Sequence, residues 1–281
     1  MIERNPILAL VLTTLAGIGI IVALYLSLND PGPPPETEEE RFERVHSVFI
    51  EAFVGGAAWS GQVEILGLQA SRTAAHTPGW QVSGTGGACD PSGSYVIRDQ
   101  PASSLVITAP HSQSDAGTGE LAQLLFEDTS ARAVAFNTAP RRASEECEAG
   151  VDLSADRWNP FSAFALAFSD ADRDGMVMQL HGYEGAQSEA AGDVIIGAGL
   201  GSSQTINSNL RSCLTGALEG VEIGLKSGGH AASNAQGRVL QVHGHRNFIY
   251  LELSDAMRQA MISDAGLRRT FAGCLASAKQ S

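Results

Sequence analysis

An uncharged apolar run near the amino terminus constrains the fold of this chain most strongly. Residues 7–28 are 22 consecutive residues without a charged side chain. At about 1.5 Å of rise per residue, a helix of this length spans the roughly 30 Å hydrocarbon core of a bilayer. The run is longer than the apolar region of an ordinary signal peptide. We therefore expect residues 1–29 to form a cytoplasmic tip and one uncleaved transmembrane signal anchor.

The residues on either side of this run predict its orientation in the membrane. Arg4 and the terminal amine precede the run, whereas acidic side chains dominate residues 30–40. We expect a single-pass protein of the inner membrane whose carboxyl-terminal part is extracytoplasmic, or periplasmic. Residues 30–40 also contain four prolines, which favour a stiff, extended linker. Residues 41–281 then remain for one domain.

Charge and cysteine content exclude some classes of protein. The chain has 18 Lys and Arg against 31 Asp and Glu, a net charge of −13, and no basic run, so we expect no nucleic-acid partner. A hydrophobic fraction of 43% with 17% charged residues is typical of a globular protein. The four cysteines permit two disulfides outside the cytoplasm, and the sequence leaves all three pairings open.

Hydrophobic periodicity along residues 41–281 predicts strands that alternate with helices. Helical spacing marks residues 41–54, a segment that starts near Thr118, and the long terminal segment, whereas residues 60–100 favour loops and short strands. Apolar, β-prone runs predict buried strands at residues 105–108, 131–138, 175–183, 193–199 and 247–254. This order predicts an α/β fold, a three-layer sandwich around a mixed, largely parallel sheet.

Two histidines lie at the ends of predicted strands, and acidic residues accompany the first. His111 comes after the strand at 105–108, and His181 comes near the end of the strand at 175–183. Functional side chains collect at the carboxyl ends of strands in such sheets. A hydrolytic zinc ion typically takes two imidazoles and one carboxylate, so Asp115 is a candidate third ligand. Glu120 is an alternative, although an acid in the first turn of a helix also has a capping role.

Glu252 interrupts the apolar strand at 247–254, where a buried carboxylate is costly unless it is paired. Near a metal it could act as the general base toward water. A structural salt bridge to Arg258 or Arg246 is the other interpretation. The segment HGHR provides a rival metal site, because His243 and His245 would point to the same side of an extended segment, although such histidines are more often partly exposed loop residues.

Four stretches in the same order resemble the zinc carboxypeptidases of the M14 type. They are His111 with its acids, Cys147 with GVDLSADRWNPF, QLHGY at 179–183, and YLELSDAMR at 250–258. In that family the first strand ends in H-x-x-E, a later H-S-Y supplies another histidine ligand, and a late F-E-L-R carries the base. The resemblance implies a zinc-carboxypeptidase-like fold, bound Zn²⁺, and Glu252 as the catalytic residue.

The chain departs from that pattern after His111. The third residue after His111 is Ser114, where the pattern has Glu, and the acid Asp115 comes one residue later. The stretch APHSQSDAGTGELA is instead similar to poly-γ-glutamate hydrolases, which carry P-H-G-G, a nearby acid and G-T-x-E-[LI]-A. That similarity implies His111, Asp115 and His181 as metal ligands. It leaves Glu120 as an alternative ligand or as a residue that supports one.

The resemblance also implies which residues bind the substrate. The family's G-V-D-x-N-R-N holds a terminal carboxylate through Asn and Arg. Here the register is shifted, so Arg157 and Asn159 are candidates by analogy, and Arg141 and Arg142 compete with them. Tyr183 matches the tyrosine of H-S-Y.

Together these features predict a membrane-anchored, zinc-dependent hydrolase that cleaves an amide or peptide bond. The substrate would bear a free carboxylate, as a cell-wall peptide, polyglutamate or an N-acyl amino acid does. The alternative is a catalytically inactive M14-like module that binds or scaffolds in the envelope, since H-x-x-E is absent and N-R-N is altered.

Overall fold

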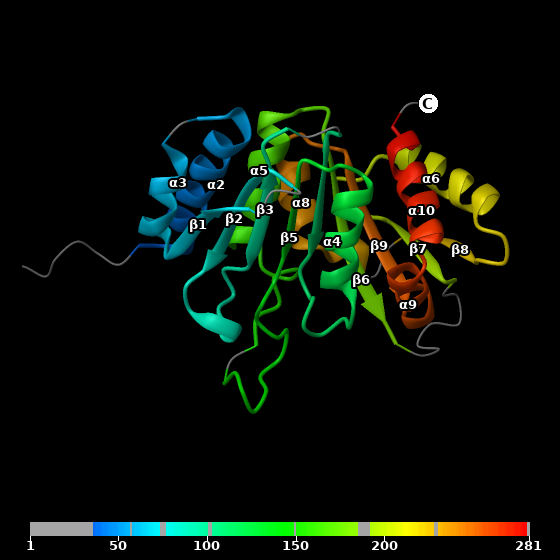
Figure 1. Cartoon of the computed structure of the whole chain (residues 1–281), viewed down its shortest axis with the longest axis horizontal. Helices are drawn as coiled ribbons and strands as arrows, with labels where there is room; N and C mark the ends of the chain where they lie inside the picture. Colours follow the sequence, from blue (N-terminus) through cyan, green and yellow to red (C-terminus); the bar gives the residue numbers. More distant parts are fainter. Residues whose placement is uncertain are drawn as a thin grey trace, which may run out of the picture. The chain divides into compact units, whose positions relative to one another are not determined.

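The structure of the chain is a computed structural model that describes residues 36–56, 58–73, 77–100, 103–148, 150–184, 192–227 and 230–279 (Figure 1). The predicted anchor at 7–28 and most of the predicted linker lie outside these ranges. Within them, no helix is both long and apolar enough to cross a membrane. Helix α2 begins at Glu38, so the last residues of the expected linker form its first turn.

Nine strands in the described residues form one sheet in the order β1-β2-β3-β5-β4-β6-β9-β7-β8. The strands are β1 Leu68–Arg72, β2 Gly79–Gly84, β3 Ser94–Arg98, β4 Leu105–Ala109, β5 Ala133–Phe136, β6 Met176–Tyr183, β7 Val194–Ala198, β8 Ile223–Ser227 and β9 Phe248–Ser254. The centre, β5-β4-β6-β9, is parallel. Strands β1, β2 and β3 extend one side of it antiparallel, and β7 pairs antiparallel with β9 on the other side. The sheet is therefore mixed, as expected, with its parallel part confined to the centre and to β7-β8.

Helices cover both faces of the sheet and make the predicted three layers (Figure 1). On one face lie α2 Glu38–Val54, α3 Trp59–Gln62, α5 Pro160–Ala171, α7 His230–Ser233 and α8 Ala235–Val242. On the other face lie α4 Thr118–Asp128, α6 Gln204–Ala217, α9 Asp255–Ser263 and α10 Ala265–Ser277. Two short 3₁₀ turns, η1 Val63–Leu66 and η2 Gly87–Cys89, are the remaining elements within the described ranges.

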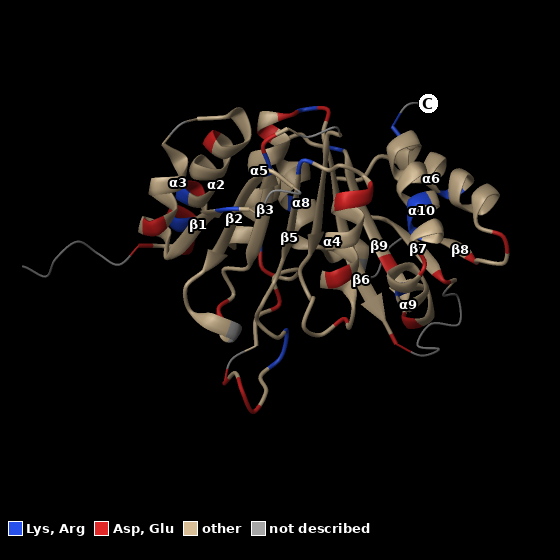
Figure 2. Ribbon diagram, in the orientation of Figure 1, with Lys and Arg blue, Asp and Glu red and all other residues tan. Residues whose placement is uncertain are grey.

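Alternate residues of the central strands feed two separate hydrophobic cores, because successive side chains of a strand point to opposite faces. Val106 and Val177 pack into the core beneath α2 and α5. Ile107 and Met178 pack into the core beneath α4, α9 and α10. Figure 2 shows the central strands drawn largely in tan, and Glu252 in β9 is the one Lys, Arg, Asp or Glu within β4, β5, β6 and β9. This agrees with the near-continuous apolar runs from which buried parallel strands were predicted.

Aromatic packing ties α2 to α5 in the first of these cores. Phe49 packs edge-on against Phe164, with ring centroids 4.9 Å apart. Phe53 packs against Phe168 at 5.4 Å. Such pairs contribute about 0.5–1.5 kcal/mol each beyond the area they bury. The apolar spacing that predicted a helix at 41–54 thus reflects this contact.

Some expected elements differ in detail. The β-prone residues at 63–66 form η1, and the terminal helical segment is two helices. Asp264 divides them because its backbone is extended and its carboxylate caps α10, accepting bonds from the backbone N–H groups of Gly266 and Leu267. Strand β8 and helix α8 had no sequence prediction.

Both possible disulfides are formed. Cys89 pairs with Cys147, and Cys213 pairs with Cys274. The first bond joins η2 to the long loop between β5 and α5. The second joins α6 to α10, on the face of the sheet that α4 and α9 also cover.

Candidate metal site

Three neighbouring parallel strands, β4, β6 and β9, bring the candidate residues to one edge of the sheet. His111 comes directly after β4, His181 lies in β6, and Glu252 lies in β9. His181 and Glu252 are register partners, so their backbones lie side by side, about 4.8 Å apart. The parallel register therefore creates the convergence that the sequence order predicted.

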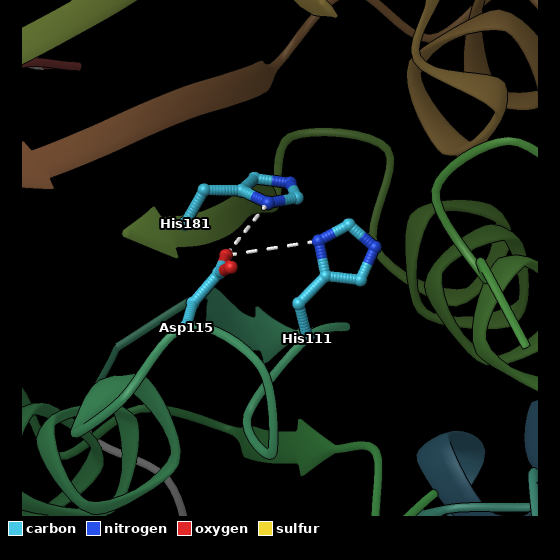
Figure 3. Close-up of side chains that lie close together, drawn as sticks. All are labelled: His111, Asp115 and His181. Atoms are coloured by element: carbon cyan, nitrogen blue, oxygen red, sulfur yellow. Dashed lines mark ion pairs between the residues drawn. The ribbon is translucent and has the colours of Figure 1, made fainter. Parts of the chain in front are cut away.

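A tight turn after β4 returns Asp115 to His111. The backbone N–H groups of Ser114 and Asp115 both donate to the carbonyl of His111, at 2.8 and 2.7 Å. The N–H of Gly182, in β6, donates to Asp115 Oδ2 at 3.0 Å. The carboxylate is thus fixed between the two imidazoles, as Figure 3 shows.

Donor atoms of His111, Asp115 and His181 all lie within 4.8 Å of one another. Asp115 Oδ2 is 3.6 Å from His111 Nδ1 and 3.4 Å from His181 Nδ1 (Figure 3). In a tetrahedral zinc site whose ligand atoms lie about 2.1 Å from the ion, neighbouring ligand atoms are about 3.4 Å apart. The two separations here are close to that value.

The far side of each imidazole is occupied by an acceptor. Asp152 Oδ1 lies 2.9 Å from His111 Nε2, and Gln179 Oε1 lies 2.9 Å from His181 Nε2. A carboxylate can only accept, so Nε2 of His111 carries a hydrogen, and in the neutral ring Nδ1 presents a lone pair. His111 Nδ1 is buried without a hydrogen-bond partner. This orphaned acceptor, facing a carboxylate, fits a cation, and the donor set of two imidazoles and one carboxylate is that of a hydrolytic zinc site.

In the metal-free chain, the charges around the site favour a bound cation. Burial acts to raise the pKa of Asp115, but the contacts with the His111 and His181 imidazoles outweigh burial and hold that pKa well below its usual range. Burial also opposes charge on His111, yet Asp115 and Asp152 raise its pKa above the ordinary value. For His181 burial dominates and lowers the pKa. A metal must therefore displace a proton chiefly from His111.

A cavity of about 690 Å³ opens onto this cluster. Besides the three residues of the cluster, it is lined by Glu252, Tyr250, Tyr183, Arg141, Arg142, Lys226 and Arg258, among others. This volume lies in the range of small-molecule and peptide sites.

Glu252 lies in the cavity and accepts a 2.7 Å hydrogen bond from the Tyr250 hydroxyl. The ring of Tyr250 packs against that of His181, with centroids 4.9 Å apart. Arg258, the proposed structural partner of Glu252, instead donates to the backbone oxygens of Ala116, Tyr183 and Leu253 and pairs with Asp255.

The candidate substrate residues separate into two groups. Arg141, Arg142 and Tyr183 line the cavity. Arg157 and Asn159 do not line it: Arg157 lies over the Trp158 ring, and Asn159 caps α5 by accepting a bond from Ser162 N–H at 2.9 Å. The shifted register of GVDLSADRWNPF explains this, because its Asn falls where a helix begins.

The other metal candidates lie apart from the cluster. Glu120 is in the first turn of α4, whose N-cap is Gly117. The HGHR segment is a turn around Gly244, at φ 84°, so the expected extended segment is absent there. His243 is exposed, whereas His245 is buried and bonds to Asp170 at 3.0 Å.

Sequence reasoning assigned no role to Asp152, Gln179 or Lys226. Asp152 is the acid of the GVD segment, so the resemblance contained its signal. Gln179 precedes His181 by two residues and therefore shares its face of β6. Lys226 lies in β8, which had not been predicted.

No protein-family model matches the sequence, and no curated protein matches it significantly. Among solved structures, the chain is similar to the catalytic domain of an N-acetylmuramoyl-L-alanine amidase from Bacillus (Paenibacillus) polymyxa, with 12% identity and a TM-score of 0.37 over 62% of this chain and 94% of that one. A metallo-carboxypeptidase from Burkholderia cenocepacia has 12% identity and a TM-score of 0.35, over 87% and 68%. An aspartoacylase family protein from Mesorhizobium loti has 14% identity and a TM-score of 0.37, over 74% and 67%. These likenesses are distant, so the functional conclusion depends on the site itself.

Proposed function

We propose that this chain is a zinc-dependent hydrolase that cleaves an amide bond in a substrate with a free carboxylate. The observation that carries the proposal is the convergence of His111 Nδ1, Asp115 and His181 Nδ1 in the lining of one cavity. Three acceptors that face one another favour a cation between them. Zinc held there would polarise a carbonyl and make water a better nucleophile.

Glu252 is placed to move the proton. Its carboxylate would take a proton from the attacking water as the water oxygen bonds to the carbonyl carbon. It would then deliver that proton to the amine nitrogen as the C–N bond breaks. The Tyr250 hydroxyl, which donates to Glu252 Oε1, keeps the carboxylate oriented.

Cationic side chains support a carboxylate-bearing substrate. Arg141 is already engaged, because its Nε donates to Asp152 Oδ2 at 2.8 Å. Arg142 is exposed, lines the cavity, and has no ion pair among the described residues. A guanidinium can bind a carboxylate through two parallel hydrogen bonds, so we assign Arg142 as the principal anchor.

The location of the domain is part of the same proposal. The uncharged run at 7–28 supports a membrane tether, and two disulfides are typical of proteins outside the cytoplasm. The substrate would then be a peptide-like or N-acyl amino acid compound of the envelope.

The experiment is metal analysis of the purified full chain, together with hydrolysis assays on amides in pairs with free and blocked carboxylates. We expect one zinc ion per chain, hydrolysis that a chelator abolishes, and preference for the free carboxylate. His181→Ala should lose the zinc, whereas His243→Ala, which changes an exposed histidine, should keep it. Unchanged zinc content in His181→Ala would refute the site, and bound zinc without hydrolysis would favour the non-catalytic module.

A further inference from the structure

A chain of buried polar side chains runs from the candidate site into the first core. Gln179, Gln236 and Asn234 are at most 2% exposed, and Thr108 is fully buried. Gln179 Nε2 donates to Gln236 Oε1 at 2.9 Å, and Asn234 Nδ2 donates to Gln179 Oε1. This series of side chains reaches the site at Gln179, whose Oε1 lies 2.9 Å from His181 Nε2. Buried polar groups are costly unless satisfied, so a fully bonded chain in an apolar layer requires a reason.

Backbone groups at both ends of this series fix which atom of each side-chain amide is the oxygen and which is the nitrogen. Gln236 Nε2 faces the carbonyl of Phe161 at 3.2 Å, and a carbonyl only accepts. Gln236 Oε1 must therefore face Gln179, and it also receives the Thr108 hydroxyl at 3.1 Å. At the other end, Asn234 Oδ1 accepts the N–H of Gly237 at 3.0 Å, so Asn234 Nδ2 must face Gln179.

Both ends thus require the same orientation of Gln179. Its NH₂ group faces the oxygen of Gln236, and its carbonyl oxygen faces both Asn234 and His181. An acceptor beside His181 Nε2 requires a hydrogen on that nitrogen. The lone pair of His181 is then on Nδ1, the atom 3.4 Å from Asp115 Oδ2.

We propose that Gln179, anchored by Gln236 and Asn234, is a positioning residue that holds His181 in the Nε2–H tautomer before any metal binds. The two imidazoles of the site are then set by different chemistry: Asp152 supports His111 with a charge, and an amide supports His181 without one. Metal binding at His181 needs no tautomer change. The inference builds on the proposed zinc site, but the tautomer is a property of the metal-free chain.

The test reads the tautomer directly, by long-range ¹H–¹⁵N correlation NMR of the metal-free full chain labelled with ¹⁵N-histidine. The chain has seven histidines, and His181→Gln identifies the signal of His181. At about pH 8, above the ordinary imidazole pKa of about 6.5, we expect the Nε2–H pattern in the wild type. A wild-type Nδ1–H pattern, or an even mixture, overturns the proposal without any substitution in the network.

Variants separate positioning from packing. Gln179→Leu leaves Asp115 as the remaining acceptor near His181, so we expect a shift to Nδ1–H and zinc affinity about 10–100-fold weaker. Gln236→Leu should keep the Nε2–H tautomer, because Asn234 still orients the Gln179 carbonyl. Asn207→Leu, a matched loss of a buried amide that donates to Gly197 O, should change neither property.

The outcomes keep this proposal distinct from the proposed function. An unchanged tautomer in folded Gln179→Leu contradicts the positioning role, and a shift to Nδ1–H in Gln236→Leu contradicts the expectation that Asn234 is enough to orient the Gln179 carbonyl. If the wild type binds no zinc, the proposed function fails, and the NMR measurement still decides the positioning role.

Discussion

The contact between Asp152 and His111 gives the sharpest quantitative prediction. Asp152 Oδ1 accepts from His111 Nε2 at 2.9 Å and from the Ser154 hydroxyl at 2.7 Å, while Oδ2 accepts from Arg141 Nε at 2.8 Å. In Asp152→Asn, the amide oxygen can still accept from His111, but the charge is lost and the NH₂ group faces the donor of Arg141. Losing such support for a ligand costs 10–100-fold in metal affinity, or about 1.4–2.7 kcal/mol. Because the acceptor remains, we expect about tenfold weaker zinc binding.

Two further variants bracket this value. Asp152→Ala also leaves the buried imidazole N–H unpaired, at a cost of about 1–3 kcal/mol, so its zinc affinity should fall toward 100-fold. Asp156→Asn removes the same charge from an exposed residue whose carboxylate accepts, among the described residues, only the Trp158 N–H, and it should bind zinc as the wild type does. Competition with a chromophoric chelator measures all three affinities.

The pH dependence of this loss has a definite sign. Asp152 raises the pKa of His111, so the wild type holds a competing proton to higher pH than Asp152→Asn does. At a pH above the His111 pKa of both the wild type and the variant, no proton competes with zinc, and the difference in zinc affinity has its full value. As pH falls through the raised wild-type pKa, proton competition weakens the wild type more, and the gap narrows. Equal zinc affinities at about pH 8, or a gap that widens on acidification, would refute the reasoning.

The remaining predictions concern catalysis, substrate and stability. Glu252→Gln should retain zinc and lose about 10²–10⁴-fold in kcat, measured by hydrolysis of the preferred amide; a kcat within tenfold of wild type would exclude Glu252 as the base. Arg142→Ala should raise KM about 10–100-fold for free carboxylates only, because the charge-assisted contact with the carboxylate is lost, while Arg157→Ala, outside the cavity, leaves KM unchanged. Replacing Cys213 and Cys274, 61 residues apart, with serine should lower the free energy of unfolding by about 2–4 kcal/mol in denaturant titration, and unchanged stability would contradict the bond.

Much of the scaffold under the site could be predicted because its signals are local. The runs that form β4, β6 and β9 are mostly apolar, and α4 begins at the expected Thr118. Since carboxyl ends of parallel strands share an edge, the positions of His111 and His181 in the sequence were enough to predict their convergence.

The contacts of the supporting residues could not be predicted, because they depend on the tertiary fold. Asp152 meets His111 across 41 residues, and Gln236 meets Gln179 across 57. Nothing in the sequence near either histidine specifies these partners. Arg157, one of the candidate anchors, is exposed and does not line the cavity. The sequence motif alone did not reveal this, because it depends on where α5 begins, at the Asn159 cap.

The bond between Cys89 and Cys147 has a consequence for where the chain can work. The loop between β5 and α5 carries Arg141, Arg142 and Asp152, and in Figure 2 this segment, which extends below the sheet, bears both acidic and basic residues. Its described residues, 137–148 and 150–159, contain no helix or strand, and Cys147 is covalently bonded to Cys89 of η2. In a reducing compartment this bond would be open, and the loop that carries Asp152, Arg141 and Arg142 would lose its covalent attachment to η2. Under the extracytoplasmic location proposed above, this loop would therefore gain its cross-link only once the domain reaches oxidising surroundings.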